Sequence, residues 1–168
     1  MKYRYCYKCG HKTEMREIDN IKRSFCISCN LVLYKNPIPS VAIVAFDKHI
    51  RLLLTKRAVD PCKGYWSLPG GFVESGENIR QAVHRELFEE TNLTCKNIQM
   101  INAESVINGY WGDILILGFS VELINFEIIA GDDADEVNFF PLDNRPEIVF
   151  PIHETFVNEF LRNTGKVE

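Results

Sequence analysis

The chain lacks the features that would place it in a membrane, outside the cell or on a nucleic acid. Its 168 residues contain no apolar run long enough to span a bilayer, and no apolar core follows the first residues as a secretory signal requires. It has no excess of positive charge either, with 19 Lys and Arg against 23 Asp and Glu. We therefore expect a cytoplasmic globular protein without a membrane or nucleic-acid partner.

What is present is enough apolar sequence for one packed domain and a small module, because hydrophobic residues make up 46% of the chain. Internal repeats and low-complexity segments are absent. The segment Asn36-Pro37-Ile38-Pro39 cannot be helical and predicts a stiff boundary. We expect two units, residues 1–35 and residues 36–168.

Four of the six cysteines have the spacing of a zinc site. They form two C-x-x-C pairs, Cys6 with Cys9 and Cys26 with Cys29. Residues 1–34 are too few to build a core, so four thiolates on Zn²⁺ would supply the missing stability. Such a site has no open position, which predicts a structural zinc ribbon. Cys62 and Cys95 are expected to be ordinary reduced thiols.

The same segment is basic, and this keeps a second class of function open. Its cationic residues include Lys2, Arg4, Lys8, Lys12, Lys22 and Arg23. Zinc ribbons often bind nucleic acid, so a ligand-sensing or RNA-binding regulator is the alternative to an enzyme.

Apolar runs rich in branched residues predict strands through the rest of the chain. The runs cover residues 41–46, 50–55, 65–68, 98–107, 114–123 and 137–140. The first two are expected to pair as a hairpin, and Pro151 begins a last amphipathic helix. Strands, helix, strands and helix in this order predict a mixed sheet between helices, an α+β architecture.

The stretch from Gly71 to Leu93 predicts a glycine-turned loop that enters a helix. Ser75 or Asn78 can cap the helix start, and Asn92 suits the left-handed conformation that follows a last turn. At 3.6 residues per turn one stripe is apolar in its first half and acidic in its second. The stripe contains positions 79, 82, 83, 86, 89 and 90.

Three carboxylates on this stripe, Glu86, Glu89 and Glu90, would repel one another without a cation. Arg85 can neutralise one of them at most. Oxygen ligands of this kind favour Mg²⁺ or Mn²⁺ over zinc or copper. The alternative is an exposed helix end on which Arg85 simply pairs with Glu89.

The stretch has the form G-x5-E-x7-R-E-x-x-E-E-x-N-L and resembles the Nudix box, G-x5-E-x7-R-E-U-x-E-E-x-G-U with U aliphatic. It departs from the box at Asn92, where the family has Gly. Together with the cysteine pairs, it makes the chain similar to zinc-ribbon Nudix hydrolases, which include NADH, ADP-ribose and FAD pyrophosphatases. The resemblance implies a Nudix α/β/α sandwich after the ribbon.

The resemblance also implies roles for particular residues. The implied Mg²⁺ or Mn²⁺ ligands are Glu86, Glu89, Glu90, Glu136 and the carbonyl of Gly70. Arg85 would orient the glutamates, and Glu77 would support the loop. Glu89 or Glu136 would take a proton as general base, so the implied catalytic residues are Arg85, Glu89, Glu90 and Glu136.

The implied reaction is hydrolysis of a nucleoside diphosphate linked to another group, with release of a nucleotide. Residues 93–123 lack the S-Q-P-W-P-F-P-x-S array of NADH pyrophosphatases. Gly109 stands where ADP-ribose hydrolases often have Pro, and Tyr110 where diadenosine polyphosphate hydrolases have Tyr. We favour ADP-ribose or FAD, with NADH or diadenosine polyphosphates as alternatives. Arg57, Tyr110 and Trp111 are the candidate substrate contacts, and a homodimer is left open.

Overall fold

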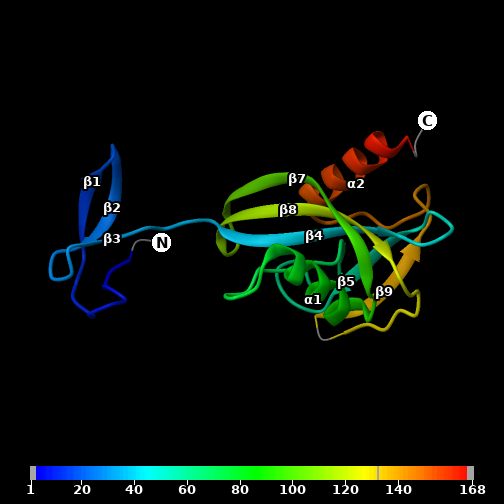
Figure 1. The fold of residues 1–168 in the computed structure, drawn as a ribbon, viewed down its shortest axis with the longest axis horizontal. Coiled ribbons are helices and arrows are strands. Elements are labelled where there is room, and N and C mark those ends of the chain that lie inside the picture. The colour runs from blue at the N-terminus through cyan, green and yellow to red at the C-terminus, as the bar shows by residue number, and fades with distance from the viewer. Residues whose placement is uncertain (1–2, 132, 166–168) are drawn as a thin grey trace. The chain divides into compact units, whose positions relative to one another are not determined.

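The computed structural model describes residues 3–131 and 133–165 of the chain (Figure 1). Lys2, one of the basic residues noted above, lies outside these residues. The chain divides into two compact units, Met1–Pro37 and Ile38–Glu168. Across the described residues, every helix is too short or too polar to cross a bilayer.

The smaller unit is built on a three-stranded antiparallel sheet. Its strands are β1 (Glu14–Ile18), β2 (Ile21–Cys26) and β3 (Leu31–Leu33), in the order β1-β2-β3. The turn before them is closed by one bridge, Tyr5 with Lys12. Its buried apolar cluster is confined to Cys6, Cys26 and Leu33. This small cluster agrees with the expectation that the segment cannot rely on a hydrophobic core.

The larger unit has a mixed sheet and two helices. Its elements are β4 (Ile38–Phe46), β5 (Leu52–Arg57), β6 (Trp66–Ser67), α1 (Ile79–Thr91), β7 (Cys95–Gly109), β8 (Gly112–Leu123), β9 (Ala134–Phe140) and α2 (Pro151–Thr164). The strand order is β6-β5-β4-β8-β7, with β9 also paired to β5. β4 and β8 run parallel, whereas the other pairs are antiparallel.

The central strand β4 explains why helices cover both faces of this sheet. Successive side chains of a strand point to opposite faces. Val41 and Ile43 belong to the apolar cluster that contains α1, while Ala42 and Val44 belong to the cluster that contains Phe156 of α2. Figure 1 shows α1 and α2 on opposite sides of the sheet. The predicted α/β/α sandwich with a mixed sheet is confirmed.

The predicted hairpin of residues 41–46 and 50–55 is only partly correct. β5 starts at Leu52, and the register of β4 with β5 is confined to Phe46 opposite Leu52. Farther back along β4, the backbone N–H groups of Val41 and Ile43 donate to the segment before α1, to Gly71 O at 2.8 Å and Pro69 O at 2.9 Å. That segment takes the edge which a full hairpin would have used, and this brings the glycine loop into the sheet.

Candidate functional site

The loop before α1 is held on β4 by contacts that only glycine allows. A Cβ atom at Gly70 would lie 2.1 Å from the carbonyl oxygen of Val41, a backbone atom that cannot move without breaking the sheet. The carbonyl of Gly71 accepts hydrogen bonds from the backbone of Val41 and from Ser40 Oγ, at 2.8 and 2.9 Å. The loop is therefore fixed against the strand, and its backbone faces the helix that follows.

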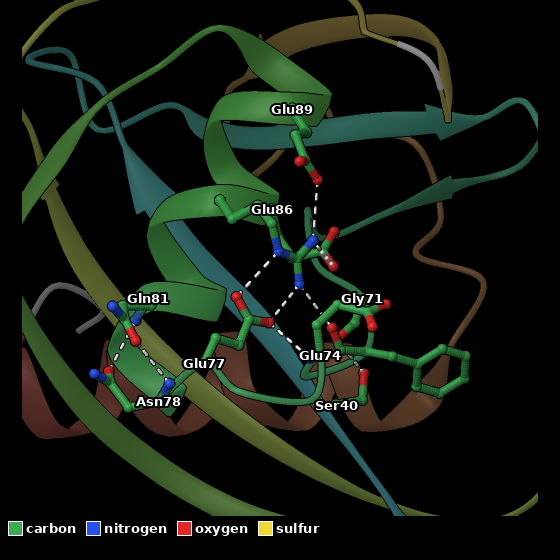
Figure 2. A network of polar contacts seen from close by, with 10 residues as sticks. Ser40, Gly71, Glu74, Glu77, Asn78, Gln81, Glu86 and Glu89 are labelled. Carbon is green, nitrogen blue, oxygen red and sulfur yellow. Dashed lines mark hydrogen bonds and ion pairs between the residues drawn. The ribbon is translucent and has the colours of Figure 1, made fainter.

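The ends of α1 are capped as the sequence predicted. The side chain of Asn78 accepts from the Gln81 backbone N–H at 3.1 Å, and the Gln81 side chain accepts from the Asn78 backbone N–H at 2.8 Å (Figure 2). This capping box satisfies two otherwise unpaired donors. Asn92 ends the helix with φ 61°, the left-handed conformation expected there. The helix is thus fixed at both ends relative to the glycine loop.

Glu90 is the most buried carboxylate of the site, with 9% of its surface exposed. Its Oε2 accepts from the backbone N–H of Gly70 at 3.2 Å and from Thr55 Oγ1 at 3.4 Å. Burial, followed by the charge of Glu86, raises the pKa of Glu90 to about 8. A cation next to this acid would favour its ionised form.

Glu86 lies against the other glycine of the loop. A Cβ atom at Gly71 would come within 2.5 Å of Glu86 Oε1 and within 2.7 Å of Oε2, so the carboxylate occupies the space that a side chain would fill. Burial also raises the pKa of Glu86, although Arg85 acts in the opposite direction. Glu86, which is mostly buried, and the buried Glu90 therefore form an acidic pair over the glycine backbone.

Arg85 contacts three carboxylates, although its single positive charge can neutralise only one of them. Its guanidinium donates to both oxygens of Glu77 at 2.7 and 3.1 Å, to Glu86 at 2.8 Å and to Glu89 at 3.0 Å. It also donates to the carbonyl of Phe72 at 2.8 Å. Figure 2 shows Glu77, Glu86 and Glu89 close together in this network. These bonds, that to Glu77 above all, raise the pKa of Arg85.

Two of the predicted metal ligands are turned toward cations of the protein. Glu89 pairs with Arg85, and its side chain is 56% exposed, so it lies off the packed stripe where periodicity had placed it. Glu136 faces Lys56 across the β5–β9 pair and bonds to it at 2.5 Å. Ile79, at the apolar start of the same predicted stripe, is exposed as well.

The donor set at α1 fits a divalent hard cation. Glu86 and Glu90 offer carboxylate oxygens close to the glycine backbone. Burial raises the pKa of both acids, and the charge of Glu86 raises that of Glu90 further. Among residues 3–131 and 133–165, however, the acids do not form a group of three or more with ligand atoms gathered closely enough for one ion. Glu89 and Glu136 would have to leave their ion pairs to join such a group.

The four cysteines of the small unit do form such a group. Their sulfur atoms all lie within 4.8 Å of one another, and Cys9 Sγ is 3.5 Å from Cys26 Sγ. Four sulfurs at about 2.3 Å from a tetrahedral zinc would be separated by about 3.8 Å, so the cluster fits that ion. The Cys29 pKa is raised to about 12 by its hydrogen bond to Cys9 and by desolvation, whereas the His11 backbone lowers the Cys9 pKa to about 6.

The candidate substrate contacts are Tyr110 and Trp111, which lie near the glycine loop, and Arg57. Trp111 lies edge-on to Phe72 of the glycine loop, with ring centroids 5.3 Å apart, and Tyr110 lies edge-on to Trp111 at 5.1 Å. Tyr110 is 72% exposed. The turn between β7 and β8 therefore places an exposed aromatic ring next to the loop. Arg57 Nε donates to Pro61 O at 2.7 Å, and its guanidinium lies 5.3 Å from the Phe150 ring centroid.

Some residues of the site were missed in the sequence. Thr55 is buried beside Glu90, and its only signal was a hydroxyl at the end of an apolar run. His153 Nδ1 accepts from the backbone N–H of Leu68 at 3.2 Å, just before the glycine turn. No pattern around His153 indicated this contact. The pairing of Lys56 with Glu136 depends on strand register, so no local pattern indicated it.

The glycine loop and α1 form a strand–loop–helix unit within an α/β/α sandwich, and this unit carries Glu86 and Glu90. The Nudix domain model matches residues 36–160, so the chain belongs to the Nudix hydrolase family.

Individual relatives agree with this assignment. An ADP-ribose pyrophosphatase of Methanocaldococcus jannaschii is 39% identical over 126 residues, which cover 74% of each chain. The NAD-capped RNA hydrolase NudC of Haemophilus influenzae is 36% identical over 103 residues, 61% of this chain and 38% of NudC. A Nudix hydrolase structure from Nitrosomonas europaea has a TM-score of 0.79 at 26% identity, covering 98% of this chain and 94% of that one. The chain thus spans well under half the length of this NudC relative.

Proposed function

We propose that the chain is a metal-dependent pyrophosphatase that hydrolyses ADP-ribose or a similar nucleoside diphosphate linked to another group, such as FAD. The observation that carries the proposal is the buried pair Glu86 and Glu90 over the glycine backbone. Burying two acids together is unfavourable unless a cation neutralises them, and a pyrophosphate substrate brings further negative charge that requires the same cation. The relative named ADP-ribose pyrophosphatase supports the choice of substrate.

In this proposal Glu86 and Glu90 hold Mg²⁺ or Mn²⁺, with Glu89, Glu136 and the Gly70 carbonyl as further ligands. A divalent cation held there supplies Lewis-acid activation of the pyrophosphate. Arg85 orients Glu86 and Glu89 from one guanidinium.

The reaction is a displacement at phosphorus. A water oxygen bonds to one phosphorus of ADP-ribose while the bond from that phosphorus to the bridging oxygen breaks, giving AMP and ribose 5-phosphate. The water's proton passes to a carboxylate. Glu89 and Glu136 are the candidate bases, because both are exposed and lie outside the pair formed by Glu86 and Glu90.

Tyr110 and Trp111 would stack on the adenine, since both rings are exposed at the turn between β7 and β8 and Trp111 packs against Phe72 of the glycine loop. Arg57 would meet the substrate's phosphates. Because Arg57 Nε donates to the Pro61 carbonyl, the contact with a phosphate would use the other guanidinium nitrogens.

The remaining expectations complete the proposal. The ribbon of residues 1–35 would hold a structural Zn²⁺, and residues 36–168 would form the hydrolase domain. A cytoplasmic location suits four thiols that must stay reduced to bind zinc. NADH and diadenosine polyphosphates are the alternative substrates, and a homodimer is one candidate assembly. The NudC relatives make a nucleotide at the end of an RNA a second candidate.

The proposal is tested by turnover of ADP-ribose, FAD, NADH and diadenosine polyphosphates with Mg²⁺ or Mn²⁺ in ¹⁸O water. We expect ADP-ribose to be hydrolysed fastest, with ¹⁸O in a single product, which identifies the phosphorus attacked. Absence of metal-dependent turnover of any of these compounds would overturn the proposal.

A substitution at Glu90 tests whether this particular carboxylate is required for activity. Glu90→Gln preserves the shape of the side chain and its hydrogen bond from Gly70, so folding is retained. Loss of one metal-binding carboxylate should lower kcat by at least roughly 100-fold. Glu127→Gln, an exposed acid of the same unit, is the matched control. Full activity of Glu90→Gln would contradict the assignment.

A further inference from the structure

The acid-bearing last turn of α1 is held by a segment that lies outside the helix. The last carbonyls of a helix have no partner within it. Here the connection between β8 and β9 supplies their donors. The Gly131 N–H donates to the Glu90 carbonyl at 3.2 Å. The Ile129 N–H donates to the Thr91 carbonyl at 3.1 Å. Residues 124–131 therefore lie against the end of the helix that carries the acids (Figure 1).

Gly131 is needed in this segment for space rather than for conformation. Its φ lies outside the left-handed region in which glycine is favoured. A Cβ atom at Gly131 would lie 1.6 Å from the Glu89 carbonyl oxygen and 2.8 Å from the carbonyl carbon. Ordinary contact begins at about 3.4 Å, so a side chain here would require the two backbones to separate by roughly 1.8 Å. Both partners are backbone atoms, so no change of rotamer can relieve the clash.

The same segment is fastened to the sheet just after Gly131. The Ala134 N–H donates to the Gly131 carbonyl at 3.1 Å, and β9 begins at Ala134. The Ala58 N–H, which directly follows β5, donates to the Asp133 carbonyl at 2.9 Å. Glu136 comes two positions farther along β9. The segment thus connects the end of α1 to the strand that carries Glu136, and it cannot retreat without breaking these bonds.

Glu90 is restrained by two glycines that belong to different parts of the sheet. Its side chain accepts from the Gly70 N–H at 3.2 Å, and its backbone carbonyl accepts from the Gly131 N–H. Glu89 has an exposed side chain, so its position depends mainly on the backbone that Gly131 touches. A displacement of either the helix end or the segment would change the distance between these acids and Glu136.

We propose that Gly131 is a positioning residue of the hydrolase site, because its contact with the Glu89–Glu90 backbone sets the spacing between the acids of α1 and Glu136. The inference rests on the proposed function, since it concerns the same acids. It gives a role to a residue that is not itself a candidate ligand or substrate contact. Oxygen ligands must lie about 2.0–2.1 Å from Mg²⁺ in near-octahedral geometry, so a shift of roughly 1.8 Å would impair binding of the cation.

The test compares Gly131→Ala with the wild type, both as full-length, zinc-loaded protein. Binding of Mn²⁺, measured from the EPR signal of the free ion, should weaken about tenfold in the variant, as is typical when an outer contact of a metal site is lost. At saturating Mn²⁺, kcat for ADP-ribose should fall by about 100-fold, the usual cost of a misplacement of about 1 Å. KM should change less than about twofold, because the proposed substrate contacts are not displaced.

The matched control is Val157→Ala, which removes buried volume beneath α2 on the opposite face of the sheet. Both variants should unfold at a lower urea concentration than the wild type. The control should nevertheless keep the wild-type Mn²⁺ affinity and kcat, since destabilisation alone does not move the acids.

Amide hydrogen exchange of the metal-free wild type provides a measurement that needs no variant. The N–H groups of Ile129 and Gly131 should exchange as slowly as the last amides of α1, because they are bonded to that helix. Exchange at the rate of an unprotected loop would overturn the inference. Wild-type Mn²⁺ affinity and kcat in Gly131→Ala, or losses equal to those of Val157→Ala, would also overturn it. A wild type that neither binds Mn²⁺ nor hydrolyses the nucleotides would instead overturn the proposed function and the inference together.

Discussion

The ribbon and the hydrolase unit arrange their candidate metal ligands in different ways. In the ribbon, four sulfur atoms lie within 4.8 Å of one another, and the group consists of cysteines alone. In the hydrolase unit, Glu86 and Glu90 lie close to the glycine loop, while Glu89 and Glu136 are paired with Arg85 and Lys56. The sulfur atoms of the ribbon already lie together, whereas two of the carboxylates are held in ion pairs.

The difference follows from the acidity of the ligands. Ordinary thiols are largely neutral near pH 7. In the ribbon the pKa of Cys9 is lowered while those of Cys26 and Cys29 are raised, so the sulfurs share little negative charge and can be brought together at little electrostatic cost. Carboxylates are ionised at this pH unless they are buried, and they repel one another. Acids that are not held by burial therefore associate with the nearest cations until a metal competes for them.

The largest expected effect tests whether the ribbon depends on its metal. Cys26→Ser, or removal of zinc with a chelator, should unfold residues 3–37, because structural zinc typically contributes about 10–16 kcal/mol at neutral pH. NMR amide dispersion and zinc content measure this, with Cys62→Ser as the control. ADP-ribose turnover should persist if the hydrolase unit folds by itself. A ribbon that stays folded without zinc would remove the contrast between the two units.

The second effect tests the ion pairs of the acidic site. Arg85→Met removes the cation shared by Glu77, Glu86 and Glu89, so the mostly buried Glu86 loses its counter-charge. We expect kcat/KM for ADP-ribose to fall by at least about 100-fold, which equals about 2.7 kcal/mol of transition-state stabilisation. Arg162→Met, on the last turn of α2, should retain activity. A variant with normal kcat/KM would show that Arg85 does not position the acids.

The third effect separates the two glycines of the loop. Gly70→Ala should lower the free energy of unfolding by roughly 2–4 kcal/mol, because its new methyl group meets the backbone oxygen of Val41. Gly71→Ala meets only the end of the Glu86 side chain, which can move, so stability should change by less than about 1 kcal/mol.

For Gly71→Ala, enzymatic activity should fall more than stability. Displacement of the Glu86 carboxylate should reduce ADP-ribose turnover about tenfold in a protein of nearly normal stability. Urea unfolding and turnover, measured on the same preparations, distinguish the two variants. Full turnover in Gly71→Ala would mean that the position of Glu86 over the glycine is not needed.

The smallest effect near neutral pH concerns acid sensitivity. Burial lowers the pKa of His153 to about 3, so between pH 6.5 and 3 the unfolded chain binds a proton that the folded chain does not. The free energy of unfolding of the hydrolase unit should therefore fall by up to about 1.4 kcal/mol per pH unit below 6.5. Urea unfolding at several pH values measures this slope.

The variant His153→Gln should flatten that slope, and the exposed His49→Gln should leave it unchanged. The ribbon should lose structure in acid for a different reason, because protons compete with zinc for its thiolates. Two separate acid transitions are therefore expected, and a single one would show that the units do not unfold independently.

Local patterns in the sequence were sufficient to predict several elements. The C-x-x-C pairs predicted a cluster of four sulfurs, and the residues around the helix predicted its caps at Asn78 and Asn92. The order of apolar runs predicted a mixed sheet between helices. These features depend on residues close together in the chain, or on a repeat that every element carries by itself.

The sequence by itself therefore determined the four-cysteine cluster, the capped helix and the fold class. Only the tertiary structure decided that Glu90 is buried beside Thr55 while Glu89 turns to solvent, and that Glu136 faces Lys56. Helical period limits which residues share a face but not how that face is rotated against the sheet. Partners that are 35 or 80 residues apart meet only because strand register brings them together.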